Sequence, residues 1–181
     1  MVYIILGKGF EEAEAIIPCD LLRRAGVEVQ FAAISDGQLS VVGRHGISVN
    51  ADCCLDDMEL WKTDMIVLPG GLGGVESILN CPKALLAVKS VYERGNYVAA
   101  ICAAPTVLAK LGLLDGKKAT CYPGMEDEMG AAVMCDEDTV CDGNVITGRA
   151  AGTAFAFGLK LVSVLCSEEI SRKIATGVVA R

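Results

Sequence analysis

Short apolar runs alternate with longer amphipathic segments along the chain. Uninterrupted apolar runs predict buried strands at residues 2–6, 27–34, 64–68 and 97–101, with further strands at residues 118–122 and 144–147. Helical periodicity predicts helices at residues 11–25, 82–94, 152–165 and 167–176. Residues 39–49 are expected to form an antiparallel segment that leaves the main β/α alternation. This alternation indicates a mostly parallel central sheet with helices on both faces.

The length and composition fit an ordinary compact α/β protein. The 181 residues include 52% hydrophobic positions and 20 glycines, and we expect a single domain over residues 1–181. The formal charge is −7 and no basic cluster exceeds a pair, so nucleic-acid binding is not expected. No apolar run reaches the roughly 18 residues that a membrane span needs.

The cysteine usage bears on location. Nine cysteines is an odd count, and the N-terminus carries no basic leader, so we predict reduced thiols in a cytoplasmic protein. Most of these cysteines are expected to fill the core as small apolar residues. The adjacent Cys53 and Cys54 point to opposite faces of a strand and make a poor metal site.

The segment 97–106 carries the strongest chemical signal. An apolar strand meets Cys102, and Pro105 then suits the first turn of a helix. Ala100 and Ala104 stand two residues before and after the cysteine, where hydrolase elbows carry glycines. A thiol at such a helix start is expected to ionise more easily than an ordinary thiol. The pattern therefore predicts a cysteine nucleophile.

Glu14 is the candidate partner of that cysteine. It shares an inward helical stripe with Ile17 and Leu21 and follows the first predicted strand. Burial raises the pKa of a carboxyl, so Glu14 is expected to be protonated and able to move protons beside Cys102. From spacing alone, a helix-dipole or capping acid is the simpler interpretation of Glu14.

Pro69-Gly70-Gly71 follows another buried strand. Glycines allow close backbone approach, so the N–H groups of Gly71 and Ala103 are candidates for an oxyanion hole. An ordinary strand-end turn explains the same residues. The glycine-rich segments do not match a dinucleotide-binding fingerprint, and no cofactor is expected.

His45 is the only histidine, so any Cys-His dyad must use it. It lies in a predicted turn, Gly43 to Gly46, where a surface histidine is the simpler interpretation. With one histidine and no C-x-x-C pair, no metal site is expected.

Several motifs, in this order and spacing, resemble the ThiJ/PfpI (DJ-one) superfamily over nearly the whole chain. They are residues 9–14 with Ile17-Pro18, Leu22 to Gly26, Val67 to Gly71, Ala99 to Thr106, and Thr147 to Arg149 with Gly152 to Ala154. The resemblance implies a flavodoxin-like three-layer sandwich, a homodimer, and no need for a cofactor.

The resemblance also implies roles for particular residues. Cys102 would be the nucleophile and Glu14 its protonated partner, with the Gly71 and Ala103 N–H groups for the oxyanion. Arg24 and Arg44 would reach the site region from the dimer interface. Many relatives carry a histidine twenty positions after the nucleophile, where this chain has Tyr122, a poor base at neutral pH. That departure argues against a protease.

Two functions remain open at this point. One is an enzyme of the glyoxalase or deglycase type that acts on small aldehydes or early glycation adducts. The other is a redox sensor or redox-regulated chaperone that uses the same cysteine without turnover. Both are linked to carbonyl or oxidative stress and depend on Cys102 and Glu14.

Overall fold

The computed structural model describes residues 1–180. The α-helices are α1 (Glu12–Arg24), α2 (Leu72–Leu79), α3 (Pro82–Glu93), α4 (Pro105–Lys110), α5 (Ala154–Leu165) and α6 (Glu168–Gly177). The 3₁₀ helices are η1 (Leu55–Asp57), η2 (Leu60–Lys62), η3 (Glu126–Glu128) and η4 (Ala151–Thr153). The strands are β1 (Val2–Leu6), β2 (Val29–Ala33), β3 (Ser40–Val42), β4 (Ser48–Asn50), β5 (Cys53–Cys54), β6 (Met65–Leu68), β7 (Tyr97–Ile101), β8 (Lys118–Ala119), β9 (Val133–Met134), β10 (Thr139–Asp142) and β11 (Val145–Gly148).

The central sheet has seven strands in the order β10-β11-β7-β6-β1-β2-β5. Every neighbouring pair is parallel except the edge pair β10–β11. The chain leaves β1 toward β2 and later returns to the other side of β1 with β6, so the order reverses between β1 and β6. Ligands of open parallel sheets bind at such a reversal, beyond the carboxyl ends of the strands.

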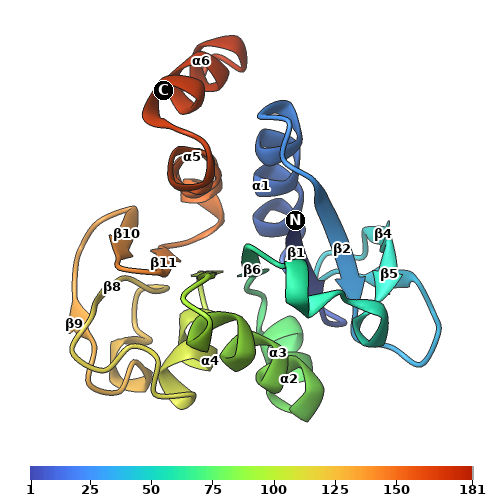
Figure 1. Cartoon of the computed structure of the whole chain (residues 1–181). Helices are drawn as coiled ribbons and strands as arrows, with labels where there is room; N and C mark the ends of the chain where they lie inside the picture. Colours follow the sequence, from blue (N-terminus) through green and yellow to red (C-terminus); the bar gives the residue numbers. More distant parts are fainter. Residues whose placement is uncertain (181) are drawn as a thin grey trace.

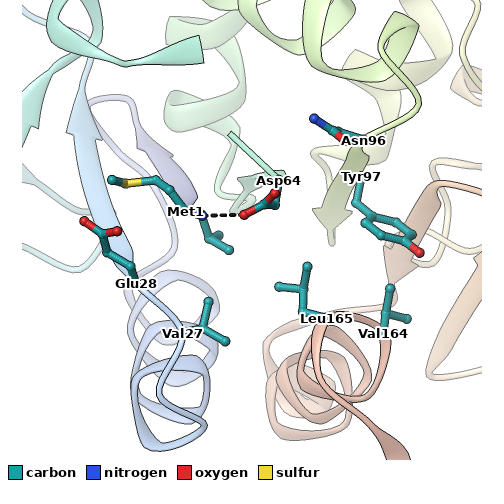
Figure 2. A pocket seen from close by; sticks show the side chains of 9 residues that line it. Met1, Val27, Glu28, Asp64, Asn96, Tyr97, Val164 and Leu165 are labelled. Atoms are coloured by element: carbon teal, nitrogen blue, oxygen red, sulfur yellow. Dashed lines mark hydrogen bonds and ion pairs between the residues drawn. The ribbon is translucent and has the colours of Figure 1, made fainter. Parts of the chain in front are cut away.

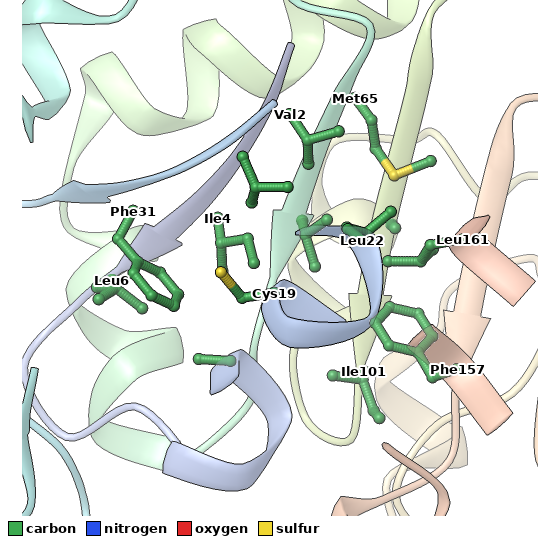
Figure 3. Close-up of a cluster of buried hydrophobic side chains, with 14 of the residues drawn as sticks. Val2, Ile4, Leu6, Cys19, Leu22, Phe31, Met65, Ile101, Phe157 and Leu161 are labelled. Atoms are coloured by element: carbon green, nitrogen blue, oxygen red, sulfur yellow. The ribbon is translucent and has the colours of Figure 1, made fainter. Parts of the chain in front are cut away.

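Helices cover both faces of the sheet and create two apolar cores. Figure 1 shows α1 and α5 on one side and α2, α3 and α4 on the other. Alternate residues of β1 point to opposite sides, so Ile4 joins the α1/α5 core and Ile5 joins the other. Figure 3 shows the first core, where Leu22 and Phe157 from the two helices meet strand residues such as Ile101. The predicted flavodoxin-like three-layer sandwich is confirmed.

The structure differs from the sequence-based prediction in several elements. The predicted strand at residues 118–122 ends after Ala119, and it pairs with β9 in a separate two-stranded sheet instead of joining the central one. The edge strand β10 lies beside the acidic stretch and was not predicted. Helix α2 was also missed, because its first turn contains Gly73 and Gly74, which are poor helix formers.

Two further predictions can be compared with the described residues. None of the helices in residues 1–180 is long and apolar enough to cross a bilayer. All nine cysteines are free thiols. Only Cys19 and Cys121 are buried, so the expectation that most of the cysteines fill the core is wrong, because the other seven lie at partly or fully exposed positions.

Candidate active site at the carboxyl ends of the strands

The turn after β7 holds Cys102 in a strained conformation. Its φ is 65°, a left-handed value that costs a side chain of ordinary shape about 1–2 kcal/mol. Two backbone hydrogen bonds fix the residue: Cys102 N–H donates to Gly148 O at 2.9 Å, and Tyr122 N–H donates to Cys102 O at 2.8 Å. Ala100 and Ala104 are fully buried, which explains why both positions carry small residues. The predicted tight turn is therefore confirmed.

Glu14 lies on α1 and is fully buried, as its helical stripe predicted. The backbone N–H of Gly70 donates to its Oε2 at 2.8 Å. Its Oε1 is buried without a hydrogen-bond partner among the described residues. A Cβ at Gly70 would lie 2.6 Å from Glu14 Oε2 and 2.8 Å from Cys102 Cβ. Gly70 thus leaves the space in which the carboxyl and the cysteine come together.

Burial dominates the electrostatics of both groups. It raises the pKa of Glu14 to about 7, against the opposing effects of the Cys102 thiol and the Gly70 N–H. Burial and the negative charge of Glu14 raise the pKa of the Cys102 thiol to about 12. The direction of the shift in the pKa of Glu14 agrees with the expectation, although a pKa of about 7 leaves the carboxyl only partly protonated at neutral pH.

The expectation of an easily ionised thiol is wrong for Cys102 facing an ionised Glu14. Helix α4 has only six residues and starts at Pro105, so its dipole is weak against burial and a neighbouring carboxylate. The two groups are better treated as one coupled pair that loses its first proton near neutral pH. The negative charge then lies mainly on the Glu14 carboxyl, because the pKa of the Cys102 thiol is higher.

The backbone N–H groups of Ala103 and Gly71 are hydrogen-bond donors to the Cys102 sulfur and lower its pKa. Gly71 has a φ of 80°, and a Cβ there would lie 2.5 Å from Gly9 O and 2.6 Å from Glu11 N. Only glycine fits this position. The structure therefore brings both predicted donors to the sulfur.

A pocket of about 420 Å³ opens beside the cysteine. Its lining comes from the turn at Cys102, the start of α2, the segment after β8 and the turn before β4. The lining residues are Arg44, Gly71, Leu72, Cys102, Ala103, Tyr122, Pro123, Gly124, Met125 and Glu128. Cys102 is half-buried, so the thiol is accessible from this pocket. Leu72, Met125 and Glu128 were not foreseen, since only their position in the fold brings them here.

The two predicted arginines have different outcomes. Arg44 lines the pocket of its own chain, with its guanidinium 4.0 Å from Glu11 Oε2, so a partner subunit is not needed to supply it. Arg24 pairs with Asp20 at 2.7 Å at the other end of α1. Ten residues of helix place it about 15 Å from Glu14, away from the site of its own chain. That a partner's Arg24 reaches the site remains a prediction.

His45 does not form a dyad with Cys102. Its ring is 61% exposed, as predicted, and its Nδ1 lies 3.0 Å from Glu12 Oε2 and 3.4 Å from Glu11 Oε1. These three residues bring potential metal ligands within 4.8 Å of one another, although Glu12 already accepts hydrogen bonds from the backbone. Tyr122, at the position of the family histidine, is 48% exposed at the pocket wall.

A second cavity, of about 460 Å³, lies at the amino ends of the strands. Figure 2 shows its lining, in which Asp64 pairs with the N-terminal amine of Met1, to the left of Asn96 and Tyr97 in this view. The residues that line it include no thiol and no buried carboxyl. We therefore assign no chemistry to it.

Comparison with known proteins agrees with the geometry. The DJ-1/PfpI family model matches residues 1–164. Drosophila melanogaster protein dj-1beta is 39% identical over 177 residues, covering 97% of this chain and 94% of the relative. A Pyrococcus abyssi protein named deglycase is 34% identical over 166 residues, covering 91% of this chain and 98% of the relative.

Solved structures extend the likeness to three dimensions. The crystal structure of Drosophila melanogaster DJ-1beta superposes with a TM-score of 0.93 at 38% identity, covering 99% of this chain and 97% of the other. An oxidised Toxoplasma gondii DJ-1 superposes with a TM-score of 0.94 at 34% identity, covering 98% and 97%. The chain belongs to the DJ-1/PfpI family.

Proposed function

We propose that this protein is a cysteine-dependent enzyme acting on small reactive carbonyls or early glycation adducts, of the glyoxalase or deglycase type. One observation carries the proposal: a strained, accessible Cys102 lies against a buried Glu14 whose pKa is about 7. A proton donor and acceptor is most effective when its pKa lies near the working pH. The deglycase name of several relatives supports the same substrate class.

Addition to an aldehyde such as methylglyoxal is the first step. The Cys102 sulfur forms a bond to the aldehyde carbon as the C=O π bond breaks, and the thiol proton moves to the Glu14 carboxylate. The negative charge that develops on the oxygen faces the Gly71 and Ala103 N–H groups. Glu14 then returns the proton to this oxygen, which gives a neutral hemithioacetal.

Proton transfer between carbons follows. Glu14 removes the proton of the carbon bonded to sulfur, which forms an enediolate. The hydroxyl proton then moves to the neighbouring oxygen, and Glu14 returns its proton to the adjacent carbon. The product is a thioester on Cys102, and water hydrolyses it to lactate and the free thiol. Methylglyoxal and water thus become lactate with no external oxidant or reductant, and no step needs a histidine.

The test is lactate formation from methylglyoxal at pH 7.5 by wild type, C102S and E14Q. We expect a loss of at least about 10³-fold in C102S and about 10²-fold in E14Q. C141S is the matched control, because it removes an exposed thiol outside the pocket and should keep wild-type turnover. A wild type as inert as both variants rejects the proposal.

A redox sensor is the second candidate, and the free Oε1 of Glu14 favours it. That buried oxygen can hydrogen-bond an oxidised sulfur, and one structural relative is described as oxidised. Two equivalents of peroxide convert the thiol to a sulfinic acid and release two waters. The raised pKa of Cys102 disfavours the thiolate that both candidates need. We place the enzyme first because Glu14 can accept the thiol proton during addition and because relatives are named deglycase.

Intact-mass analysis separates this candidate from random oxidation. Mild peroxide should add two oxygens at Cys102 in wild type, and E14Q should change how far oxidation proceeds at that thiol. Oxidation of the exposed Cys141 or Cys166 before Cys102 contradicts the sensor.

We further propose a homodimer in the cytoplasm. Ile16 of α1 and Ile47 before β4 are 41% and 55% exposed, and they are large apolar side chains of the kind that interfaces cover. Light scattering at micromolar concentration should give twice the chain mass, and I16E/I47E should give a monomer. A wild-type monomer contradicts this assembly.

A further inference from the structure

Glu12 is a buried carboxyl that the proposed reaction does not use. It opens α1 and is only 4% exposed, although it lies two residues before Glu14. A buried charge is costly unless hydrogen bonds satisfy it, so its partners need an explanation.

Its partners all belong to the loop at residues 43–47. Glu12 Oε1 accepts the backbone N–H of His45 at 2.8 Å and that of Ile47 at 3.3 Å, and Oε2 lies 3.0 Å from His45 Nδ1. A Cβ at Gly43 would lie 2.5 Å from the Glu12 Cδ and Cγ atoms. The loop therefore closes tightly around the carboxyl group.

These contacts keep Glu12 ionised. Burial alone raises the pKa of Glu12, but the hydrogen bonds from the His45 ring, from its own backbone N–H and from the His45 and Ile47 backbone together outweigh it. The pKa consequently lies below the ordinary value, and the loop binds a carboxylate at neutral pH.

The same loop carries Arg44 to the pocket. Arg44 N–H donates to Phe10 O at 2.8 Å, and the side chain lies at the pocket wall with Cys102. Its positive charge lowers the pKa of Glu14, against burial and against the raising effect of Glu11. The position of the loop therefore affects the pair that performs the proposed chemistry.

We propose that Glu12 is a positioning residue: its carboxylate holds the loop at residues 43–47 so that Arg44 stays at the wall of the Cys102 pocket. An effect of Glu12 substitutions on turnover rests on the proposed function. Their effect on the pH dependence of Cys102 alkylation does not. The charged or titratable groups acting on Glu14 are Cys102, Glu11 and Arg44, and only Arg44 is carried by the loop.

The sign of one shift distinguishes this role from a direct electrostatic effect. Deleting the negative charge of Glu12 lowers the pKa of a nearby carboxyl if nothing moves. Displacing the positive charge of Arg44 raises it. The test is the rate of Cys102 alkylation by iodoacetamide from pH 5 to 10. The pH dependence of this rate follows the ionisation of the Cys102–Glu14 pair and does not require turnover.

In E12A we expect the alkylation midpoint to move upward by about half a pH unit, the scale for one half-exposed charge. R44A should move it by a similar amount, and E12A/R44A should move it no further than R44A alone. E12Q should stay at the wild-type midpoint or slightly below it, because its amide oxygen can still accept both loop N–H groups while its negative charge is lost. G43A is a second variant that displaces the Glu12 carboxyl, and it should shift the midpoint upward as well.

The control is D52A, which removes a carboxylate that accepts Phe31 N–H at 2.7 Å elsewhere in the molecule. It should leave the midpoint unchanged. An unchanged or lowered midpoint in both E12A and G43A, or additive shifts in the double variant, overturns the role of Glu12. Upward shifts in a protein that makes no lactate support Glu12 as a positioning residue and reject the proposed enzyme.

Discussion

Two cavities of similar size lie at opposite ends of the central sheet, and they differ in almost everything else. The cavity at the amino ends has about 460 Å³ and the pocket at the carboxyl ends about 420 Å³. The first pairs an exposed Asp64 with the N-terminal amine. The second holds a half-buried cysteine with positive φ beside a fully buried glutamate. Volume alone therefore does not distinguish a site that can support catalysis.

The direction of the strands accounts for this difference. At the carboxyl ends, turns such as Gly70-Gly71 and Cys102-Ala103 point backbone N–H groups into the pocket. Donors held in place can stabilise a developing negative charge without rearranging. The amino-end cavity is lined instead by apolar side chains and acids at the surface, such as Val164 and Glu28.

Among substitutions that disrupt the carboxyl-end site, Gly70→Ala should have the largest effect. The added Cβ would overlap both the Glu14 carboxyl and the Cys102 side chain, so we expect about 10²-fold less lactate formation and a loss of about 1–3 kcal/mol in stability. Gly95→Ala, at the start of the strand near the other cavity, is the control.

Gly95 has a φ of 80°, and a Cβ added there would have no atom within 4 Å. Its substitution should cost about 1 kcal/mol through backbone strain and leave turnover intact. Equal turnover in G70A and wild type contradicts the account of the carboxyl-end site.

The next effect is a pH-dependent change in stability at Glu14. Its pKa is about 7 when folded and 4.5 in the reference state, so between these values the folded protein binds the extra proton. The free energy of unfolding therefore falls as pH rises through this window, by on the order of 3 kcal/mol.

E14Q lacks this titration and should become more stable relative to wild type between pH 5 and pH 8. Urea unfolding of both proteins at each pH measures the difference, in which the titrating groups that are not coupled to Glu14 cancel. A difference that stays constant with pH contradicts a raised pKa at Glu14.

The smallest effect concerns strain at the elbow. Because Cys102 has a φ of 65°, glycine at this position should be more stable than alanine by about 1 kcal/mol. Urea unfolding of C102G and C102A measures this difference. Within a regular strand the alanine variant would instead be the more stable of the two. Greater stability of C102A shows that the turn is not strained.

The sequence predicted the elements with strong periodicity and the residues at their junctions. The apolar run before Cys102 and the inward stripe of Glu14 were sufficient to place both side chains, because a parallel sheet brings its strand ends to one edge. The ionisation of Cys102 was predicted in the wrong direction, since burial depends on residues distant in sequence.

Other parts of the site carry no local signal. Leu72 and Met125 reach the pocket only because α2 and the segment after β8 pack beside the elbow. Glu12 looks like an ordinary acid at a helix start until the loop at residues 43–47 closes over it. Such tertiary contacts cannot be derived from periodicity.

The central claim is that Cys102 and Glu14 titrate as one pair, and the pH profile of Cys102 alkylation in wild type and E14Q tests it most directly. The account predicts that wild-type reactivity rises near pH 7 to a low plateau, because the carboxylate formed there can accept the thiol proton and produce a minor population of thiolate. E14Q should lack this rise and show a single inflection above the ordinary thiol value of about 8.5, because burial remains. Identical profiles for the two proteins would contradict the coupling and the chemistry built on it.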